Sequence, residues 1–334
     1  MIHNTVLEAI GNTPIVRLNK VAAGVKANVF AKLEFANPGG SVKDRVGWWL
    51  IEDAERRGRL KPGGVVIEAT GGNTGVGLAM AAAVKGYQCI FVVPAKVSEE
   101  KQKTLRAFGA RVVVTPTGLL PGDPGSNYAV AKRMAEETPN AVYIDQYNNP
   151  ANLDHHYRKT GPEILRQMPE IDVFVAGIGT GGTVMGVGKC LKEQKPGVEV
   201  VAVDPVGSVI HDTFKYGESK SRSSSYMVEG IGKQWLPGIF DFKLIDDIVQ
   251  VDDKESFLMT RRILTDEGIF AGASSGSAVV GALRWITAQG DRLDGKNVLV
   301  IFVDSGYRYI SKVYDDDWMR KKGFLDADAA SAAV

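Results

Sequence analysis

The most regular feature of the chain is an alternation of short apolar runs with segments of helical periodicity. The apolar runs are rich in Val, Ile and Phe, and they lie at 65–69, 89–93, 111–114, 142–144, 173–176, 200–203 and 298–302. Most of them lead through a Gly- or Pro-containing turn into a helical pattern. Continuous apolar strands that alternate with helices are typical of parallel sheets covered on both faces. The pattern therefore predicts an α/β protein.

Local signals place some of the element ends. Ser98 and Ser126 precede helical patterns and are expected to cap them, and Gly109 follows the end of the first of these helices. Residues 148–162 contain turn signals without strong periodicity, which makes them the best candidate for a linker. The polar segment 217–225 is expected to form a surface loop, and the Ala-rich C-terminal tail is expected to fray.

Length, charge and cysteine content exclude several classes of protein. A chain of 334 residues is longer than one hydrophobic core usually supports, so two domains or one large α/β unit are expected. Lys and Arg number 40 against 39 Asp and Glu, and a net charge of +1 gives no electrostatic case for binding nucleic acid or an anionic membrane. Two cysteines exclude a disulfide framework. Because no signal peptide opens the chain and no apolar stretch reaches the ~18 residues of a membrane span, we expect a cytoplasmic protein.

Glycine is the compositional outlier, with 38 residues where typical usage gives roughly 23. The Gly-rich loop 177–183 follows a predicted strand and opens a helix, so its backbone N–H groups and the helix dipole can bind an anion such as phosphate. Gly177, Gly179 and Gly182 also match the G-x-G-x-x-G spacing of a dinucleotide site, with Asp204 at the end of the next strand. A phosphate site, a dinucleotide site and a ligand-free turn all remain open from this loop alone.

Two further loops carry polar side chains at the start of a helix. The loop 70–75 can present its amides to an anion such as a carboxylate, and Asn73 adds a donor and an acceptor; an ordinary turn is the alternative. Lys43 lies near the start of another predicted helix, where a cation is disfavoured and a lowered pKa suits Schiff-base chemistry. A solvated surface lysine is the alternative there. The sequence contains no Walker A motif and no metal-ligand spacing.

Taken together, these segments resemble the β-synthase family of pyridoxal-phosphate enzymes, whose members include cysteine synthase and cystathionine β-synthase. The matching motifs occur in the family's order and cover about residues 5–315: Gly11–Pro14, Ser41–Arg45, Gly72–Gly75, Gly179–Thr183, Val228–Gly232 and Gly272–Gly276. The resemblance implies fold type II, similar to tryptophan synthase β, in which each of two domains is a largely parallel twisted sheet flanked by helices. We expect a smaller mobile domain at 36–150, a larger cofactor-binding domain at 10–35 and 151–318, and a C-terminal tail at 319–334.

The resemblance also implies roles for individual residues. Lys43 is expected to form the internal aldimine with pyridoxal 5′-phosphate, and Ser274 to face the pyridine nitrogen. Asn73 is expected to hydrogen-bond the ring's 3′-oxygen. The residues implied to hold the 5′-phosphate are Gly179, Thr180, Gly181, Gly182 and Thr183. The residues implied to bind the substrate are Thr70, Gly71, Gly72, Asn73, Thr74, Gln146, Tyr147 and Gly230.

These roles imply β-replacement through an aminoacrylate, with freed Lys43 as general base. The segments 145–147, 204–208 and 228–230 resemble those of cystathionine β-synthases, and the segment 311–319 resembles the bacterial ones. The expected reaction therefore joins serine, or an activated serine, to homocysteine. Release of hydrogen sulfide from cysteine is an expected side activity. The alternatives are cysteine synthesis from O-acetylserine and sulfide, an NAD-dependent dehydrogenase and a non-catalytic binding module. The family implies a homodimer that takes small amino acids and thiols.

The chain departs from the family's pattern at two motifs. Gly71 stands where the family's Thr-Ser-Gly-Asn-Thr loop has Ser, which removes a hydroxyl expected to contact the substrate carboxylate. Tyr307 stands where the family's Ser-Gly-Glu-Arg segment has Glu. No segment resembles the haem-binding extension or the regulatory tandem module of some family members, so control by haem or adenosylmethionine is not expected.

Overall fold

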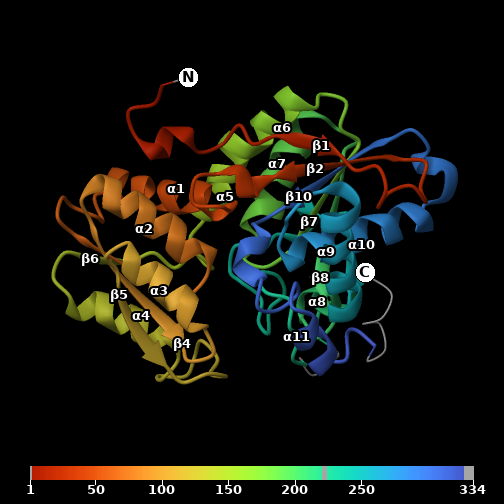
Figure 1. Cartoon of the computed structure of the whole chain (residues 1–334). Coiled ribbons are helices and arrows are strands. Elements are labelled where there is room, and N and C mark those ends of the chain that lie inside the picture. The colour runs from red at the N-terminus through yellow and green to blue at the C-terminus, as the bar shows by residue number, and fades with distance from the viewer. Residues whose placement is uncertain (1, 220–223, 327–334) are drawn as a thin grey trace. The chain divides into compact units, whose positions relative to one another are not determined.

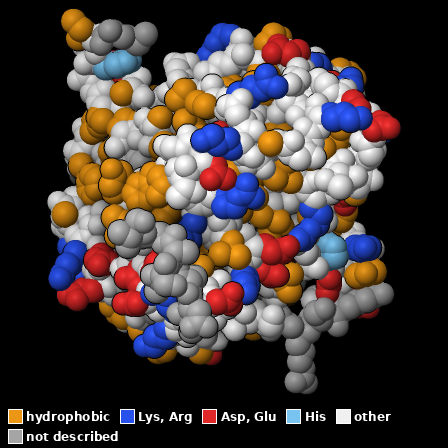
Figure 2. Space-filling view, turned by 45° about the vertical axis from the view of Figure 1, so that its right-hand side comes forward, with side chains coloured by type: hydrophobic (Ala, Val, Ile, Leu, Met, Phe, Trp, Pro, Cys, Tyr) orange, Lys and Arg blue, Asp and Glu red, His pale blue; other side chains and the backbone are white. Residues whose placement is uncertain are grey.

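The structure of the protein is a computed structural model that describes residues 2–219 and 224–326. Parts of the loop expected at 217–225 and of the tail expected at 319–334 lie outside the described residues. Among the residues described, no helix is long and apolar enough to cross a membrane. Figure 2 shows basic and acidic side chains interspersed over the face in view, as a net charge of +1 leads one to expect.

The chain divides into two compact units, each made of two segments of sequence (Figure 1). Unit 1 comprises Met1–Asn12 and Asn37–His156, and unit 2 comprises Thr13–Ala36 and Tyr157–Val334. Each unit contains its own sheet and its own buried apolar clusters. The two are therefore described separately.

Unit 1 is built on a four-stranded parallel sheet in the order β5-β4-β3-β6. Its elements are β3 (Val65–Glu68), β4 (Gln88–Pro94), β5 (Arg111–Thr115), β6 (Ala141–Tyr143), α1 (Lys43–Arg56), α2 (Asn73–Lys85), α3 (Glu99–Ala107), α4 (Asn127–Glu137), α5 (Ala151–His155) and a 3-10 turn at Val6–Ala9. Successive strand residues point to opposite faces. Val66 and Phe91 pack in a cluster with α1 and α2, whereas Ile67 and Val92 pack in a cluster with α4. The apolar runs are continuous because both faces are covered.

Unit 2 is built on a six-stranded sheet in the order β1-β2-β10-β7-β8-β9, in which β1 runs antiparallel to β2 and the other neighbours are parallel. Its strands are β1 (Ile15–Arg17), β2 (Asn28–Leu33), β7 (Val173–Gly177), β8 (Glu199–Pro205), β9 (Asp247–Val251) and β10 (Asn297–Phe302). Its helices are α6 (Gly161–Gln167), α7 (Gly182–Gln194), α8 (Ile210–Tyr216), α9 (Asp253–Glu267), α10 (Ala273–Ala288) and α11 (Asp316–Lys321). Shorter helical turns cover Glu34–Ala36, His156–Thr160, Phe242–Leu244, Gly290–Leu293 and Gly306–Tyr309. The expected α/β class with largely parallel sheets is confirmed.

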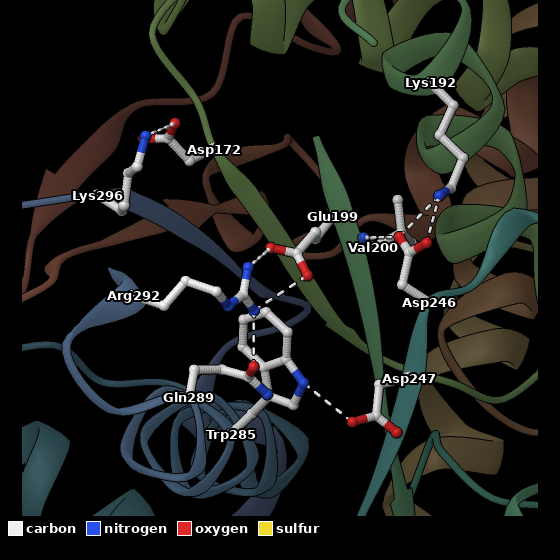
Figure 3. Close-up of polar contacts among 10 residues, drawn as sticks. All are labelled: Asp172, Lys192, Glu199, Val200, Asp246, Asp247, Trp285, Gln289, Arg292 and Lys296. Atoms are coloured by element: carbon white, nitrogen blue, oxygen red, sulfur yellow. Dashed lines mark hydrogen bonds and ion pairs between the residues drawn. The ribbon is translucent and has the colours of Figure 1, made fainter. Parts of the chain in front are cut away.

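The amino ends of the parallel strands of unit 2 are fixed by charge pairs (Figure 3). Glu199 at the start of β8 pairs with Arg292 at 2.6 Å, and Lys296 before β10 pairs with Asp172 before β7 at 3.2 Å. At the start of β9, Asp247 accepts a hydrogen bond from the Trp285 indole at 3.0 Å. In other open parallel sheets, ligands bind at the opposite edge, in the loops at the carboxyl ends of the strands.

Several local predictions are confirmed. The Ser98 side chain accepts from the N–H of Lys101 at the start of α3, and the Ser126 side chain does the same for Ala129 at the start of α4. Gly109, with φ +86°, lies just past the end of α3. Positive φ is the conformation in which glycine ends helices most readily.

The linker interpretation of 148–162 is wrong in its local structure. This segment is helical, because Pro150 starts α5 and the chain continues through a π-helical turn at His156–Thr160 into α6. The boundary between the two units nevertheless falls inside it, between His156 and Tyr157. The sequence analysis also missed β1, β2 and β9, which are short or partly exposed and lack a continuous apolar run.

Candidate active site

Lys43 is the first residue of α1, as its sequence context predicts. The loop before it is tied down locally: the Asp44 carboxylate accepts from the N–H of Gly39 at 2.6 Å, and the Ser41 hydroxyl accepts from the N–H of Lys43 at 3.1 Å. The Lys43 side chain is half-buried. Together with His155 and Arg45, it lowers the pKa of the buried His156 imidazole, an effect to which burial contributes most. His156 is therefore neutral beside the lysine.

The helix that begins at Lys43 crosses α2 at very short range. A Cβ at Gly77 of α2 would lie 2.3 Å from the backbone oxygen of Lys43, and a Cβ at Gly47 of α1 would lie 2.3 Å from the backbone of Gly77. Real Cβ atoms do not come this close to backbone, so both positions require glycine. This contact holds the start of α1 close to α2, whose first residue is Asn73.

The loop before α2 and the loop after β6 meet because β3 and β6 are adjacent and parallel. Thr74 Oγ1 donates to Gln146 Oε1 at 2.7 Å, and the Thr70 hydroxyl accepts from the N–H of Gly72 at 3.3 Å. Tyr147 is buried and its ring contacts that of Tyr128 edge-on at 5.5 Å between centroids. Burial, with smaller contributions from neighbouring carboxylates, raises the pKa of Tyr147 to about 12. The expected substrate residues 70–74 and Gln146 thus lie together at the amino end of α2, whereas Tyr147 packs against Tyr128 of α4.

The presence of glycine at position 71 is explained by the neighbouring side chain of Val97. A Cβ at this position would lie 2.7 Å from both γ-carbons of Val97, which belongs to the loop between β4 and α3. Val97 is half-buried and packs against the same apolar cluster as α1 and α2. An apolar side chain therefore fills the space beside the loop into which a side chain at position 71 would extend.

In unit 2, the loop after β7 forms a cradle of backbone amides. Gly181 adopts φ +90° as the N-cap of α7, and the Thr180 hydroxyl accepts from the N–H of Gly182 at 3.3 Å. A Cβ at Gly179 would lie 2.5 Å from the backbone oxygen of Gly230, which itself has φ +91°. The loop is thus pressed against a second backbone segment, and Thr183 lies in the first turn of α7. Amides of this kind at a helix start fit a phosphate.

Ser274 lies in the first turn of α10, at the carboxyl edge of the same sheet, and is buried. A Cβ at Gly272, the N-cap, would lie 2.0 Å from Asp304 Oδ1, so the start of α10 is pressed against the loop after β10. The hydroxyl oxygen of the neighbouring Ser275 is buried and has no hydrogen-bond partner among the described residues. A neutral hydroxyl beside an aromatic ring nitrogen does not promote protonation of that nitrogen, whereas a carboxylate does. Hydroxyls at a helix start therefore suit a ring nitrogen that stays unprotonated.

Residues 6–304 match the model of a protein family described as pyridoxal-phosphate dependent enzyme. The chain belongs to this family. Pyridoxal phosphate is accordingly its cofactor, and the amide cradle of Gly179–Thr183 fits the phosphate of that group. The dinucleotide interpretation of the same loop is set aside.

Curated relatives of this pyridoxal-phosphate dependent enzyme include cystathionine beta-synthases. That of Apis mellifera is 43% identical over 323 residues, which are 96% of this chain and 63% of the relative. That of Mus musculus is 45% identical over 323 residues, 96% of this chain and 57% of the relative. The chain spans about three fifths of the length of these relatives.

Solved structures show the same fold. A cysteine synthase from Entamoeba histolytica matches with a TM-score of 0.85 at 34% identity, covering 94% of this chain and 91% of that one. A hydrogen sulfide-producing enzyme from Fusobacterium nucleatum matches with a TM-score of 0.82 at 33% identity, covering 92% and 97%. The fold is therefore fold type II, as the sequence motifs lead one to expect.

Asp204, which completes the dinucleotide fingerprint in the sequence, has a different environment in the structure. It is fully buried, and its Oδ2 accepts from the N–H of His211 at 3.0 Å. Burial is the main cause that raises its pKa to about 7, and a hydrogen bond from Ser208 acts in the opposite direction. A buried carboxyl that binds its own loop is not placed to receive a ribose.

Sequence reasoning missed four residues that shape the site: Gly47, Gly77, Val97 and Glu68. The two glycines look like ordinary helix residues until the crossing of α1 and α2 is known. Val97 is a conventional loop residue in the sequence. Glu68 carried a signal that could have been used, because it is a charged residue at the end of an otherwise apolar strand.

Proposed function

We propose that this enzyme catalyses β-replacement on serine, or on a serine with an activated hydroxyl, and that homocysteine is the incoming thiol, so that the product is cystathionine. The observation that carries the proposal is the pairing of Thr74 with Gln146 at 2.7 Å beside the amino end of α2. The Gln146 amide, oriented by Thr74, and the amino end of α2 offer hydrogen-bond and helix-dipole interactions to an amino-acid carboxylate. The identity to cystathionine beta-synthases over 96% of the chain supports the choice of reaction.

The proposal assigns the cofactor to named groups of the chain. When bound, pyridoxal phosphate withdraws electrons from the Cα of an amino acid and so acidifies its proton. The amides of Gly179–Thr183 would hold the phosphate, Ser274 would face the ring nitrogen and Asn73 the 3′-oxygen. The amine of Lys43 would hold the cofactor covalently while no amino acid is bound.

The remaining steps fall to the chain's own side chains. While it does not hold the cofactor, Lys43 Nζ would accept the Cα proton and return it at the end of the reaction. The amides of loop 70–74 and the Gln146 side chain orient the carboxylate so that the Cα–H bond faces that amine. The neutral hydroxyl of Ser274 would not enforce protonation of the ring nitrogen, which suits β-replacement. Motion of unit 1 during turnover belongs to the same proposal, because the reacting carbon has to be kept from water.

The test is the absorbance of the purified protein before and after addition of L-serine. A visible Schiff-base band that shifts on addition of serine, and that is absent in Lys43→Ala, is the expected result. Steady-state rates with homocysteine and with sulfide then identify the second substrate. A preference for sulfide contradicts the proposed product, and a protein that binds no pyridoxal phosphate contradicts the whole assignment.

A second candidate is cysteine synthesis from O-acetylserine and sulfide, with hydrogen sulfide release from cysteine as the related side activity. The specific support is structural, since the solved structures named above are a cysteine synthase and a hydrogen sulfide-producing enzyme. The same rate comparison separates the two candidates.

We also propose that the enzyme is a cytoplasmic homodimer. The half-buried Trp48 and Trp49 of α1 supply apolar surface of the kind found at such interfaces, although Trp48 also hydrogen-bonds Glu52 at 2.7 Å within its own helix. Sedimentation of the purified chain tests the dimer, and fractionation of cells tests the compartment.

A further inference from the structure

Glu68 is a buried carboxyl group at the end of β3 that the proposed chemistry leaves unused. Its side chain is 0% exposed, and Oε1 accepts from Gln146 Nε2 at 3.2 Å. Oε2 is buried without a hydrogen-bond partner among the described residues. Glutamates are almost never fully buried unless they are paired, and the hydrogen-bond donors to Glu68 here are the neutral side-chain amide of Gln146 and backbone amides. An uncommon placement of this kind at the edge of a candidate site calls for a role.

Glu68 fixes the orientation of the Gln146 amide together with Thr74. Thr74 Oγ1 donates to Gln146 Oε1, so the NH₂ end of the amide points to Glu68. The backbone of Gln146 is held as well, because Asn152 Nδ2 donates to its carbonyl oxygen at 2.8 Å. An NH₂ group has two hydrogens, and with one directed to Glu68 the other is left for a ligand.

The surroundings of Glu68 disfavour its ionised form. Burial raises the pKa of the carboxyl to about 8, and the charge of Asp145 acts in the same direction, while hydrogen bonds from Gln146 and from the backbone act against them. The other titratable groups that face it are the tyrosines 143 and 147, with Tyr128 of α4 behind them, and burial raises the pKa of Tyr143 and of Tyr147. These tyrosines stay neutral and place no charge beside Glu68. Because its pKa is about 8, Glu68 is a neutral acid near pH 7.

We propose that Glu68 is a positioning residue for the substrate carboxylate, which acts through Gln146 and makes the binding of the amino acid depend on a proton held at Glu68. The inference rests on the proposed function, which places the carboxylate at Gln146. With Glu68 protonated, one amide NH₂ group bridges a neutral acid and the substrate anion. With Glu68 ionised, two anions share the two hydrogens of that group in a buried place, and they repel each other. Affinity for the amino acid therefore falls as pH rises past the point at which Glu68 loses its proton.

The experiment measures the dissociation constant of L-serine from the absorbance of the holoenzyme between pH 6.5 and pH 9.5, for the wild type and for Glu68→Gln. Glutamine keeps the shape of the protonated acid and cannot ionise. From pH 7 to pH 9 the dissociation constant of the wild type is expected to rise about tenfold more than that of Glu68→Gln. Equal pH dependence in the two proteins overturns the proposal.

The same substitution made in a Gln146→Ala variant shows whether Glu68 acts through Gln146. In Gln146→Ala, the further change Glu68→Gln is expected to leave the dissociation constant of L-serine and its pH dependence unaltered. The effects of the two substitutions are then not additive, because Glu68 influences serine only through Gln146. A full effect of Glu68→Gln in that background also overturns the proposal.

A readout without cofactor or substrate separates this inference from the proposed function. In urea unfolding of the apoprotein, the wild type is expected to lose stability from pH 5 to pH 8, because the unfolded chain releases the Glu68 proton and the folded chain keeps it. Glu68→Gln is expected to lose less. If serine changes the absorbance of the wild type at no pH, the proposed function fails and the positioning role fails with it, and the unfolding data then show that Glu68 holds a proton for another reason.

Discussion

The two Gly-rich turns of this enzyme, 70–75 in unit 1 and 177–183 in unit 2, look alike in sequence and differ in what surrounds them. Both follow a parallel strand and open a helix, α2 and α7. In the second turn, Gly179 is pressed against the backbone of Gly230, and Gly181 has φ +90°. In the first turn, the atoms nearest to a Cβ at Gly71 would be those of the Val97 side chain, and a Cβ at Gly72 would meet nothing within 4 Å.

This difference matches what the two turns are proposed to bind. A backbone-to-backbone contact cannot adapt, which suits a phosphate that is the same in every catalytic cycle. A contact between a loop and a valine side chain can change by a single substitution, which suits the recognition of a variable substrate. We infer that the cofactor loop is the rigid member of the pair and that the substrate loop is the adjustable one.

The largest effect is expected for Gly179→Ala compared with Gly72→Ala. The new Cβ of Gly179→Ala lies 2.5 Å from the Gly230 carbonyl oxygen, so the amide cradle has to open. Affinity for pyridoxal phosphate should fall at least about 100-fold, or about 3 kcal/mol, as measured by fluorescence titration of the apoprotein. Gly72→Ala is the matched control and should retain the cofactor. Equal retention by both variants would remove the distinction between the two turns.

The next effect concerns the support of the substrate loop. Gly77→Ala in the interior of α2 would normally favour the helix by up to about 1 kcal/mol. Here the Cβ would lie 2.3 Å from the backbone oxygen of Lys43, so we expect a loss of stability of about 3 kcal/mol in urea unfolding. Gly122→Ala, whose Cβ meets nothing within 4 Å, is the control. A stabilised Gly77→Ala protein would show that the crossing of α1 and α2 is looser than described.

A smaller effect is expected at the adjustable contact itself. Gly71→Ser introduces a Cβ at 2.7 Å from Val97 and should raise the KM for the amino acid about tenfold, or about 1.4 kcal/mol. Val97→Ala removes the obstacle, so the double variant should return to within about twofold of the wild type. The double-mutant cycle in KM and kcat gives the coupling energy. Additive effects would mean that Val97 does not determine which residue fits at position 71.

The smallest effect concerns the buried carboxyl of unit 2 that parallels Glu68 of unit 1. The pKa of Asp204 is raised to about 7, so the folded protein keeps a proton that the unfolded chain loses near pH 4. Stability therefore falls with rising pH over this range, and Asp204→Asn should reduce the fall by about 1 kcal/mol between pH 6 and pH 7.5. Urea unfolding at the two pH values measures it. If the stability of Asp204→Asn falls with pH as much as that of the wild type, the proton is held by a group other than Asp204.

Much of the fold could be predicted from the sequence because its strands are buried on both faces. The runs at 173–176 and 298–302 are apolar without interruption, and the run at 65–69 is interrupted only by Glu68; such runs have few alternatives to a covered parallel sheet. The helix starts at Ser98 and Ser126 were equally visible, since capping depends on neighbouring residues in the chain. Strands β1, β2 and β9 were missed because their residues are polar or partly exposed, and only pairing with a neighbouring strand makes them strands.

The sequence by itself determined the family, the parallel α/β architecture and the candidate residues of the two turns, because motifs and apolar runs are local properties of the chain. The tertiary structure alone decided that Gly47 and Gly77 must be glycine, that Val97 fills the space beside Gly71 and that Glu68 hydrogen-bonds Gln146. Each of these contacts joins residues on different elements. These contacts follow from how helices, strands and loops pack, which spacing along the chain does not specify.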